Sequence, residues 1–305
     1  MKNRSLMKCA VIGSTKIAEI HIREYVKNNF KNITIISRKK TKAKHFANLM
    51  KNKFNIKFNY SNHKIFKNTD FHIVSICSNS KFHLKHVNQI KNPNTKIIIE
   101  KPIFNIKENS KIIKTLDNIY VKKKNLFVVY PMYYLAKIFQ NKFKYRHPIK
   151  NLDVYYQTRG KHIGKEIFLD LAPHVLIIMY ELVKKYNLEE LQLEKVIVKK
   201  NQFLFKSKFK NITLNIRLLQ LPAKKKSVFK FKINNQIVKR HTSVVNNTFL
   251  NFLEFKKKKI YIDNPMSLVM KNFIENNGSS KEYKINKNIT YHLMQFTKRV
   301  YETIS

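Results

Sequence analysis

Apolar residues in the first 130 positions occur as short runs separated by segments of helix length. The runs lie at Cys9 to Ile12, Ile33 to Ile36, Ile73 to Cys77, Ile97 to Ile99 and Leu126 to Tyr130. Continuous apolar runs of this length are typical of strands that are buried on both faces of a parallel sheet. The intervening segments predict helices near residues 17–28, 41–52, 81–91 and 107–116. This alternation predicts right-handed βαβ units and a doubly wound parallel sheet.

The pattern changes after about residue 152, where strands follow one another and are joined by turns such as Asn234-Asn235. We expect strands at 153–156, 193–199, 203–208, 212–218, 227–233, 236–241, 248–255 and 258–262, and helices at 174–186, 266–275 and 290–304. Such a series predicts a large, mostly antiparallel sheet with helices on one side. The chain is therefore expected to be an α/β protein with a parallel-sheet domain at 1–125 and an α+β domain at 126–305. Its final helix, about 288–304, is able to pack back on the first domain.

The chain carries 62 Lys and Arg against 18 Asp and Glu, which gives a formal net charge of +44. Because basic surfaces attract phosphate backbones, this charge by itself suggests a nucleic-acid partner. The cations are spread over the whole sequence and accompany many Asn, Ile, Phe and Tyr residues, with only 4 Gly and no Trp. That composition is typical of A+T-rich coding. We therefore expect solvated charges and no specific nucleic-acid partner.

Several other classes of protein are also excluded by the sequence. No apolar stretch reaches the roughly 18 residues of a transmembrane helix, and the apolar run behind the basic start, Cys9 to Ile12, is too short for a signal-peptide core. The two cysteines, Cys9 and Cys77, cannot form a disulfide framework and lack metal-ligand spacing. We expect a cytoplasmic protein with reduced thiols, no metal and no membrane partner.

The junction between the first strand and the first helix has the context of a dinucleotide-binding turn. Gly13, Ser14, Thr15, Lys16 and Ile17 lead from the strand into the helix. The amides and the positive dipole end of a helix N-terminus bind phosphate, and the two hydroxyls add donors. Thr15 stands where a glycine normally lets the backbone approach a pyrophosphate. A plain turn between a strand and a helix is therefore the alternative interpretation.

The segment after the second strand bears on the choice of nicotinamide cofactor. Ser37, Arg38 and Lys39 stand where folds that select NAD place an acidic residue against the ribose diol. A hydroxyl followed by cations suits a 2′-phosphate, so the segment favours NADP(H) over NAD(H). In a chain this rich in lysine, the same cations are also expected by chance.

The tetrad Ile99-Glu100-Lys101-Pro102 is the strongest single sign of a functional site. The apolar strand runs directly into an ionisable amine, and open α/β sheets bind their ligands at the carboxyl ends of the strands. Pro102 ends the strand because it lacks a ladder donor. Taken alone, the tetrad is explained equally well as a strand that ends in solvated charges.

Four segments of the chain match the motifs of one enzyme family. Gly13 to His21 follows a G-x-G-x-[IL]-A-x-x-H opening, and Ile76-Cys77-Ser78 with His83 follows an I-x-T-P-x-x-x-H segment. Glu100-Lys101-Pro102 is an E-K-P motif, and Asp170 to His174 follows a D-x-G-x-H motif. In this order and spacing they make nearly the whole chain resemble the Gfo/Idh/MocA family, the oxidoreductases related to glucose-fructose oxidoreductase and inositol dehydrogenase.

The resemblance implies a Rossmann domain that binds NAD(P), followed by an open-faced sheet domain that binds a small-molecule substrate. It implies that Lys101 lies at the nicotinamide and the reacting carbinol, that His174 exchanges the hydroxyl proton, and that Asp170 assists His174. Oxidising an alcohol requires such a base and a hydride acceptor. The predicted cofactor-binding residues are Gly13, Ser14, Thr15, Lys16, Ile17, Ser37, Arg38, Lys39, Cys77, Ser78, Asn79, His83, Glu100 and Lys101. The predicted substrate-binding residues are Lys101, Tyr130, Arg159, His162, Asp170 and His174.

The sequence thus predicts an NAD(P)-dependent oxidoreductase that acts on CH–OH groups of a sugar, sugar nucleotide or polyol. The resemblance also predicts a homodimer or homotetramer formed through the C-terminal sheet. The chain departs from the family pattern at Thr15, Asn79, Ala172 and Ile177, which replace a glycine, a proline, a glycine and, for many members, an acidic residue. These departures keep open a non-catalytic, cofactor-sensing regulatory or scaffold protein with the same fold. Packing or surface roles remain the alternative for the predicted substrate residues Tyr130, Arg159 and His162.

Overall fold

A computed structural model of the chain describes residues 3–108, 111–145, 147–183, 191–222, 227–245 and 248–304. It divides into two compact units. The first comprises Met1–Val129 and Met270–Tyr291, and the second comprises Tyr130–Val269 and His292–Ser305. No helix among the described residues combines the length and the apolar character that crossing a membrane requires. The described residues also contain no group of three or more His, Cys, Asp or Glu that could hold a metal ion.

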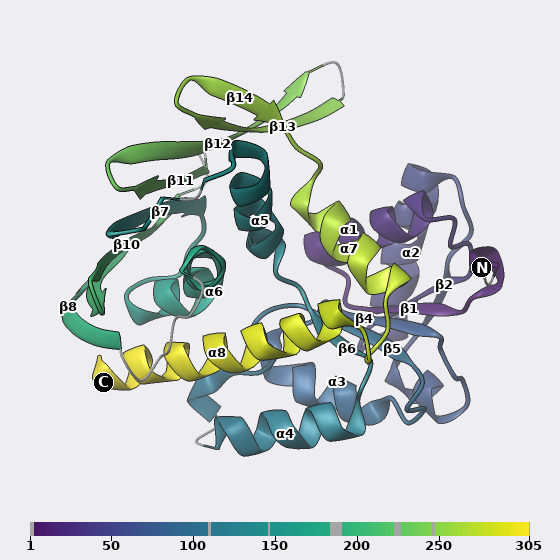
Figure 1. Ribbon diagram of the computed structural model, residues 1–305. Helices are drawn as coiled ribbons and strands as arrows, with labels where there is room; N and C mark the ends of the chain where they lie inside the picture. Colours follow the sequence, from purple (N-terminus) through teal and green to yellow (C-terminus); the bar gives the residue numbers. More distant parts are fainter. Residues whose placement is uncertain are drawn as a thin grey trace. The chain divides into compact units, whose positions relative to one another are not determined.

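The first unit is built on a six-stranded sheet in the order β3-β2-β1-β4-β5-β6, in which every pairing is parallel (Figure 1). Its strands are β1 (Cys9–Ile12), β2 (Ile33–Ile36), β3 (Asn59–Ser61), β4 (Ile73–Ile76), β5 (Lys96–Ile99) and β6 (Leu126–Val128). The order reverses between β1 and β4, as in a doubly wound Rossmann sheet, and this is where such sheets bind ligands. The sheet confirms the predicted fold class. The short polar strand β3 is an addition to the prediction.

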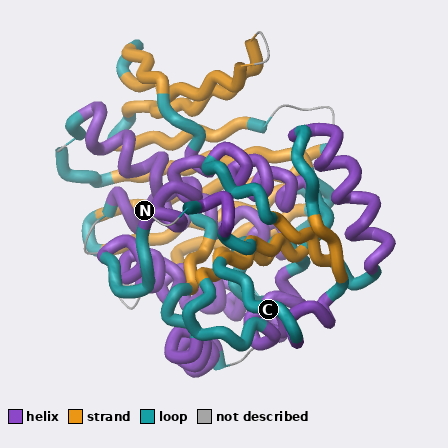
Figure 2. The backbone as a smooth tube through the Cα atoms, turned by 90° about the vertical axis from the view of Figure 1, so that its right-hand side faces the viewer, coloured by secondary structure: helices purple, strands orange, loops and turns teal. Residues whose placement is uncertain are grey.

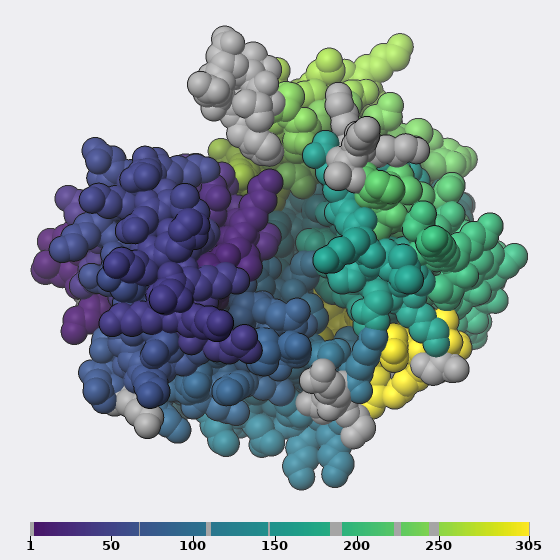
Figure 3. Space-filling view, turned by 180° about the vertical axis from the view of Figure 1, so that it is seen from behind, coloured from purple at the N-terminus to yellow at the C-terminus, as the bar shows by residue number. Residues whose placement is uncertain are grey.

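Helices connect the strands of this sheet. They are α1 (Lys16–Lys27), α2 (Lys40–Phe54), α3 (His83–Gln89) and α4 (Ile112–Lys122), and Figure 3 shows the surface formed by α1 and α2 in purple and dark blue. Short 3-10 turns, η3 (Ser80–Phe82) and η4 (Ile106–Glu108), occupy the starts of the third and fourth predicted helices. The first part of α8 (Lys281–Thr303) also belongs to this unit, where the Asn286 side chain bonds both backbone polar groups of Val128 at 2.8 Å.

The second unit contains an eight-stranded sheet in the order β14-β13-β12-β11-β7-β10-β9-β8. Its strands are β7 (Asn151–Arg159), β8 (Leu191–Lys199), β9 (Gln202–Phe209), β10 (Ile212–Leu221), β11 (Val228–Ile233), β12 (Gln236–Val245), β13 (Thr248–Phe255) and β14 (Lys258–Tyr261). Neighbouring strands are antiparallel except β7 and β10, which are parallel. Figure 2 shows these strands, in orange, following one another across the sheet. The predicted antiparallel, open-faced sheet is therefore confirmed.

One face of this sheet is covered by helices, and the described helices leave the other face open (Figure 1). The covering helices are α5 (Pro131–Phe143), α6 (Lys165–Leu182) and the last part of α8. Phe139 of α5 is fully buried, and its ring lies 5.3 Å from the rings of both Phe231 and Phe255. Side chains alternate along the strands, so Leu152 and Val154 of β7 are buried against the helices.

Four helices differ from the prediction. The helix expected at 107–116 is α4, which starts five residues and ends six residues later. The helix expected at 174–186 is α6, which begins at Lys165 and runs through Pro173, while residues 184–190 lie outside the described part. The helix expected at 290–304 begins earlier, at Lys281. The α5 helix was not predicted, although Pro131 at its first position is a known start signal. A further helix, α7 (Pro265–Glu275), agrees with the expected segment to within one residue.

Candidate functional site

Three loops of the first unit begin at the same level, at the carboxyl edge of the parallel sheet. The strands end in register, with Ile12 opposite both Ile36 and Ile76, and the ladder then extends by one further residue on each loop. The amides of Gly13, Cys77 and Glu100 donate to Ile36, Ile12 and Ile76 over 2.9, 2.9 and 3.0 Å. The turn after β1, the loop after β4 and the Glu-Lys-Pro tetrad therefore lie together at the switch point of the sheet.

Gly13 makes the close approach between the first two of these loops possible. Its φ is +129°, and a Cβ at this position would lie 2.8 Å from the Cys77 carbonyl oxygen. A side chain here would require both a disfavoured backbone conformation and a displaced neighbouring strand end. The first glycine of the predicted dinucleotide turn is thus required by the geometry.

Thr15 serves as the N-cap of α1. Its backbone is extended, with φ −127°, and its hydroxyl oxygen accepts a hydrogen bond from the Ala18 amide over 3.2 Å. The amides of Lys16 and Ile17 have no recorded partner within the described chain. These amides and the helix dipole fit an anionic phosphate. The threonine in place of glycine therefore caps α1 through the Ala18 amide and does not engage the Lys16 and Ile17 amides.

The loop after β2 presents cations and no carboxylate. The Ser37 amide donates to the Ser61 carbonyl over 3.2 Å, which ties the loop to β3. Arg38 and Lys39 are exposed, and Lys39 precedes α2 without making a side-chain cap. The loop thus offers a hydroxyl and two cations, and residues 37–39 contain no carboxylate to accept from a ribose diol.

The loop after β4 is supported from behind by His83. This imidazole is 1% exposed, with its Nδ1 2.9 Å from the Pro102 carbonyl and its Nε2 2.9 Å from the Ser78 carbonyl. Asn79 accepts the Lys81 amide and caps η3, and the buried Ser78 hydroxyl has no partner in the described part of the chain. The His83 side chain is thus engaged by backbone on both sides, whereas the Ser78 hydroxyl is available to a ligand.

The Glu-Lys-Pro tetrad follows β5 directly. The Glu100 carboxylate is 15% exposed and lies 3.0 Å from Nε2 of the fully buried His21. Lys101 is half-buried, and its peptide bond to Pro102 is cis. Cys77 lies nearby in the core, where burial raises the pKa of its thiol well above the ordinary value and Glu100 adds to the effect. Cys77 is therefore an inert thiol that contributes packing at this edge.

Asp170 and His174 belong to the second unit and lie four residues apart on α6, so they share one face of that helix. His174 is half-buried, and its ring packs edge to face on Tyr156 of β7 at 5.4 Å. Burial raises the pKa of Tyr156 to about 12, an effect opposed by Arg240 and reinforced by Asp170. The helix thus presents a carboxylate and an imidazole beside a phenol that remains protonated at neutral pH.

Gln220 is a site residue that sequence reasoning missed. It lies on β10, is 3% exposed, and donates from Nε2 to Asp170 Oδ2 over 2.5 Å. Its Oε1 accepts the His162 amide over 2.9 Å, and the neighbouring Gly160 has no room for a Cβ against this side chain. Gln220 therefore fixes both Asp170 and the loop before α6. Its only signal in the sequence is an amide within the apolar run Leu218 to Leu221.

The remaining predicted substrate residues occupy different surroundings. Tyr130 is buried and forms the N-cap position of α5, where its carbonyl accepts the Tyr133 amide over 3.2 Å. Arg159 and His162 are exposed, at the end of β7 and in the loop held by Gln220. The proposed catalytic residues are divided between the units, with Lys101 on the first and Asp170 and His174 on the second.

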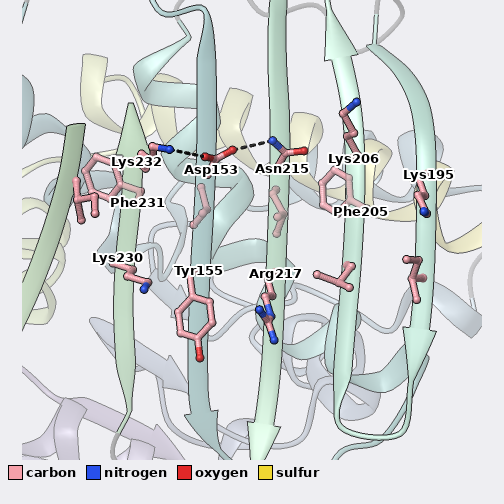
Figure 4. Close-up of a pocket in the computed structure, with 15 residues that line it drawn as sticks. Asp153, Tyr155, Lys195, Phe205, Lys206, Asn215, Arg217, Lys230, Phe231 and Lys232 are labelled. Atoms are coloured by element: carbon pink, nitrogen blue, oxygen red, sulfur yellow. Dashed lines mark hydrogen bonds and ion pairs between the residues drawn. The ribbon is translucent and has the colours of Figure 1, made fainter. Parts of the chain in front are cut away.

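A cavity of about 400 Å³ lies on the open face of the second sheet, away from α6 (Figure 4). Its floor is apolar at Ile197, Leu204 and Ile237. Cationic side chains at its rim are Lys195, Lys206, Arg217, Lys230 and Lys232, and Asp153 is the carboxylate among the lining residues. Tyr155 lies under Arg217 and Lys230, at 5.8 and 4.9 Å from its ring centroid. None of the predicted site residues lines this cavity.

Comparison with known proteins agrees with this geometry. Residues 7–130 match the family model described as "Oxidoreductase family, NAD-binding Rossmann fold", the Gfo/Idh/MocA model. No curated protein matches the chain by sequence.

Solved structures share the fold over nearly the whole chain. A dehydrogenase (MviM) from Clostridium difficile is 13% identical with a TM-score of 0.70, over 98% of this chain and 99% of the other. A UDP-N-acetylglucosamine 3-dehydrogenase, GnnA, from Acidithiobacillus ferrooxidans is 12% identical with a TM-score of 0.62, over 95% and 96%. The 3-ketoreductase KijD10 from Actinomadura kijaniata, solved with TDP-benzene and NADP, is 10% identical with a TM-score of 0.66, over 95% and 96%. At these identities the likeness establishes the architecture of both units.

Proposed function

We propose that this chain is an NAD(P)-dependent oxidoreductase of the Gfo/Idh/MocA family, whose model matches residues 7–130. The reaction is hydride transfer between a nicotinamide and a carbinol or carbonyl of a sugar, sugar nucleotide or polyol-like substrate. The observation that carries the proposal is the convergence of the Gly13 turn, the α1 N-terminus and the Glu100-Lys101 loop at the switch point of one parallel sheet. The solved neighbours include a UDP-N-acetylglucosamine 3-dehydrogenase and a 3-ketoreductase solved with TDP-benzene and NADP, which supports a sugar-related substrate.

Six of the predicted residues have a chemical role in this proposal. The amides of Lys16 and Ile17 hold the cofactor phosphates, and the Ser78 hydroxyl donates to the bound cofactor. When bound, the nicotinamide cofactor supplies the hydride acceptor or donor. The Lys101 ammonium donates a hydrogen bond to the carbinol oxygen, and His174 takes the hydroxyl proton on Nδ1 or Nε2 during oxidation and returns it during reduction. Asp170 stabilises the imidazolium that forms.

NADP(H) is the proposed cofactor rather than NAD(H). The support is the loop after β2, which offers Ser37 and the exposed Arg38 and Lys39 and no carboxylate. A 2′-phosphate gains charge-assisted hydrogen bonds there, while a ribose diol lacks its usual acidic acceptor. Binding of both cofactors, followed by the fluorescence of the reduced nicotinamide, tests the preference.

The decisive experiment for the whole proposal uses the full chain. NADPH and NADH are titrated first, and turnover is then measured with a panel of UDP- and TDP-linked sugars and free polyols. Lys101→Ala is expected to reduce turnover by about 100-fold or more. Lys107→Ala, which removes an exposed lysine from the same segment, serves as the control. Absence of nicotinamide binding, or unchanged turnover in Lys101→Ala, would contradict the proposal. Binding of NADPH without turnover of any substrate would favour the cofactor-sensing alternative, which the departures at Thr15 and Asn79 keep in view.

We also propose that copies of the chain associate through the open face of the second sheet. The apolar floor formed by Ile197, Leu204 and Ile237 supports this, because an uncovered apolar sheet face gains free energy when a partner covers it. Its rim of lysines repels the same rim on another copy, so association should strengthen as salt is added. Sedimentation at low and high salt checks this expectation, and Leu204→Glu should abolish the association.

A further inference from the structure

A fully buried histidine of the first unit connects three of its elements. His21 lies on α1, with Nδ1 3.0 Å from the Ser75 hydroxyl of β4 and Nε2 3.0 Å from the Glu100 carboxylate that follows β5. The proposed cofactor and substrate contacts of this chain do not include His21. Its place is nevertheless specific, because it engages the residue directly before Lys101.

A buried hydrogen-bond chain lies behind His21. The Tyr25 hydroxyl is completely buried and lies 2.6 Å from the Ser75 hydroxyl, which in turn lies 3.0 Å from His21 Nδ1. Burial raises the pKa of Tyr25 well above its ordinary value, so the phenol stays protonated. A His21 ring that carries its proton on Nε2 donates to Glu100 and accepts from Ser75 on Nδ1, an arrangement that gives every member of the chain a partner.

His83 holds the segment on its other side. Its Nδ1 lies 2.9 Å from the Pro102 carbonyl, and its Nε2 lies 2.9 Å from the Ser78 carbonyl. Both carbonyls only accept, and burial lowers the pKa of His83, so the neutral ring donates to one of the two. One imidazole thus contacts the residue before Lys101, and a second, on a different helix, lies within hydrogen-bond distance of the residue after it.

A nearby histidine shows that burial alone does not create this arrangement. His86 is 5% exposed and lies on the same helix as His83, but its recorded ring hydrogen bond is to Gln89, on its own helix. It stacks on His63 at 4.6 Å and makes no recorded bond to the tetrad. His86 is therefore a matched control for a histidine that packs without contacting the tetrad.

We propose that His21 is a positioning residue that fixes Lys101 by holding Glu100. The consequence for chemistry rests on the proposed function, in which Lys101 contacts the reacting carbinol. A misplacement of about 1 Å at a reacting group costs up to roughly 100-fold in rate. Holding the carboxylate beside Lys101 therefore has a measurable effect on turnover, although His21 does not touch the substrate.

Two substitutions of His21 separate the hydrogen bond from simple packing. His21→Asn keeps a polar group near Nδ1 but is too short to reach Glu100, whereas His21→Gln places an amide near the position of Nε2. We expect His21→Asn to lower kcat by about 10- to 100-fold while the Kd of NADPH changes by less than about threefold, since the α1 amides are untouched. His21→Gln should restore most of kcat, and His86→Asn should leave kcat unchanged.

A double-mutant cycle tests whether His21 acts through Glu100. The Glu100→Gln and His21→Asn changes should be strongly non-additive, because either one alone removes the same interaction. Equal losses in His21→Asn and His86→Asn, or additive losses in the cycle, would overturn the proposal. A second cycle combines His21→Asn with Lys101→Ala. If His21 acts on turnover through Lys101, His21→Asn should have no further effect on kcat in the Lys101→Ala background.

Thiol alkylation gives a measurement that does not depend on turnover. In Lys101→Cys the introduced thiol is half-exposed, whereas burial raises the pKa of both Cys9 and Cys77 and keeps them unreactive. His21→Asn should change the rate of alkylation by iodoacetamide by about threefold or more in this background, because the fixed carboxylate suppresses the adjacent thiolate. His21→Gln and His86→Asn should not change it. If no nicotinamide binds to the native chain, the proposed function fails, while the alkylation rates still decide whether His21 positions residue 101.

Discussion

Replacing Gln220 with leucine should release Asp170 and the loop before α6 together. Gln220 is buried on β10, donates to Asp170 Oδ2 over 2.5 Å and accepts the His162 amide over 2.9 Å. Leucine has nearly the same volume and forms neither bond. The change therefore removes the polar contacts with little loss of packing, and the gap at Gly160 stays filled.

The expected magnitude follows from the two bonds. A hydrogen bond to a charged carboxylate contributes about 1.5 to 3 kcal/mol, and a neutral one about 0.5 to 1.5 kcal/mol. Because Asp170 is half-buried and His162 is exposed, water replaces part of the lost hydrogen bonding. We therefore expect the local opening free energy of the loop to fall by about 2 to 3 kcal/mol, which corresponds to roughly 30- to 150-fold faster exchange.

Hydrogen exchange measured by mass spectrometry is the appropriate assay, because two units need not unfold in one step. Peptides that cover residues 159–170 should exchange faster in Gln220→Leu, and the His162 amide should lose its protection. Gln192→Leu, an exposed glutamine on β8, is the matched control. If both variants exchange at the native rate over this segment, the bridging role of Gln220 is refuted. Turnover should also fall in Gln220→Leu, since Asp170 is no longer held beside His174.

Three further predictions concern the first unit. Burial, together with the charges of His86 and Lys85, lowers the pKa of His63 from its ordinary 6.5 to about 4. The unfolded chain therefore binds this proton more tightly than the folded chain does. The free energy of unfolding should fall as the pH drops from about 6.5 toward 4. His63→Phe should flatten this acid limb in urea unfolding, whereas the exposed His45→Phe should not. Gly278→Ala should destabilise the unit by more than about 1 kcal/mol, measured by thermal unfolding, because its Cβ would overlap the Lys124 carbonyl. Ser37→Asp should shift the ratio of NADH to NADPH affinity toward NADH by about tenfold or more, and an unchanged ratio would count against the 2′-phosphate assignment.

The parallel sheet was predictable because its strands carry their own signal. Runs such as Ile33 to Ile36 and Ile97 to Ile99 are β-branched and buried on both faces, so composition and burial agree. The β3 strand lacks that signal, since Asn59–Ser61 is short, polar and paired on one side only. Its existence depends on the neighbouring β2 strand, which offers unpaired backbone groups.

The α6 helix begins before Pro173, although a proline favours a helix start at or just before its own position. A proline inside a helix removes one backbone donor and crowds the preceding turn. Against this cost, Ile167 and Phe168 are completely buried on the turns that precede it. Their burial contributes about 1.5 to 3 kcal/mol each, so the apolar face extends the helix to Lys165 despite the proline.

The supporting contacts of the site could not be deduced from local sequence. His21 and Glu100 are 79 residues apart, and Gln220 and Asp170 are 50 apart, so each pair depends on strand order rather than spacing. Motif residues such as Gly13 and Lys101 were predictable because they directly follow strands. The residues that hold them in place are ordinary until the sheet brings them together.

The threonine in the dinucleotide turn illustrates how a departure from a motif is judged. Glycine is needed where φ is positive or where a neighbouring chain leaves no room, and Gly13 meets both conditions. Thr15 does not meet the first condition, since its φ of −127° is open to any residue. Its hydroxyl oxygen takes the Ala18 amide, which glycine cannot do, and N-caps of this kind stabilise a helix start by about 1 kcal/mol. The exchange therefore strengthens the start of α1 without engaging the Lys16 and Ile17 amides, so neither backbone strain nor helix capping requires a glycine at position 15.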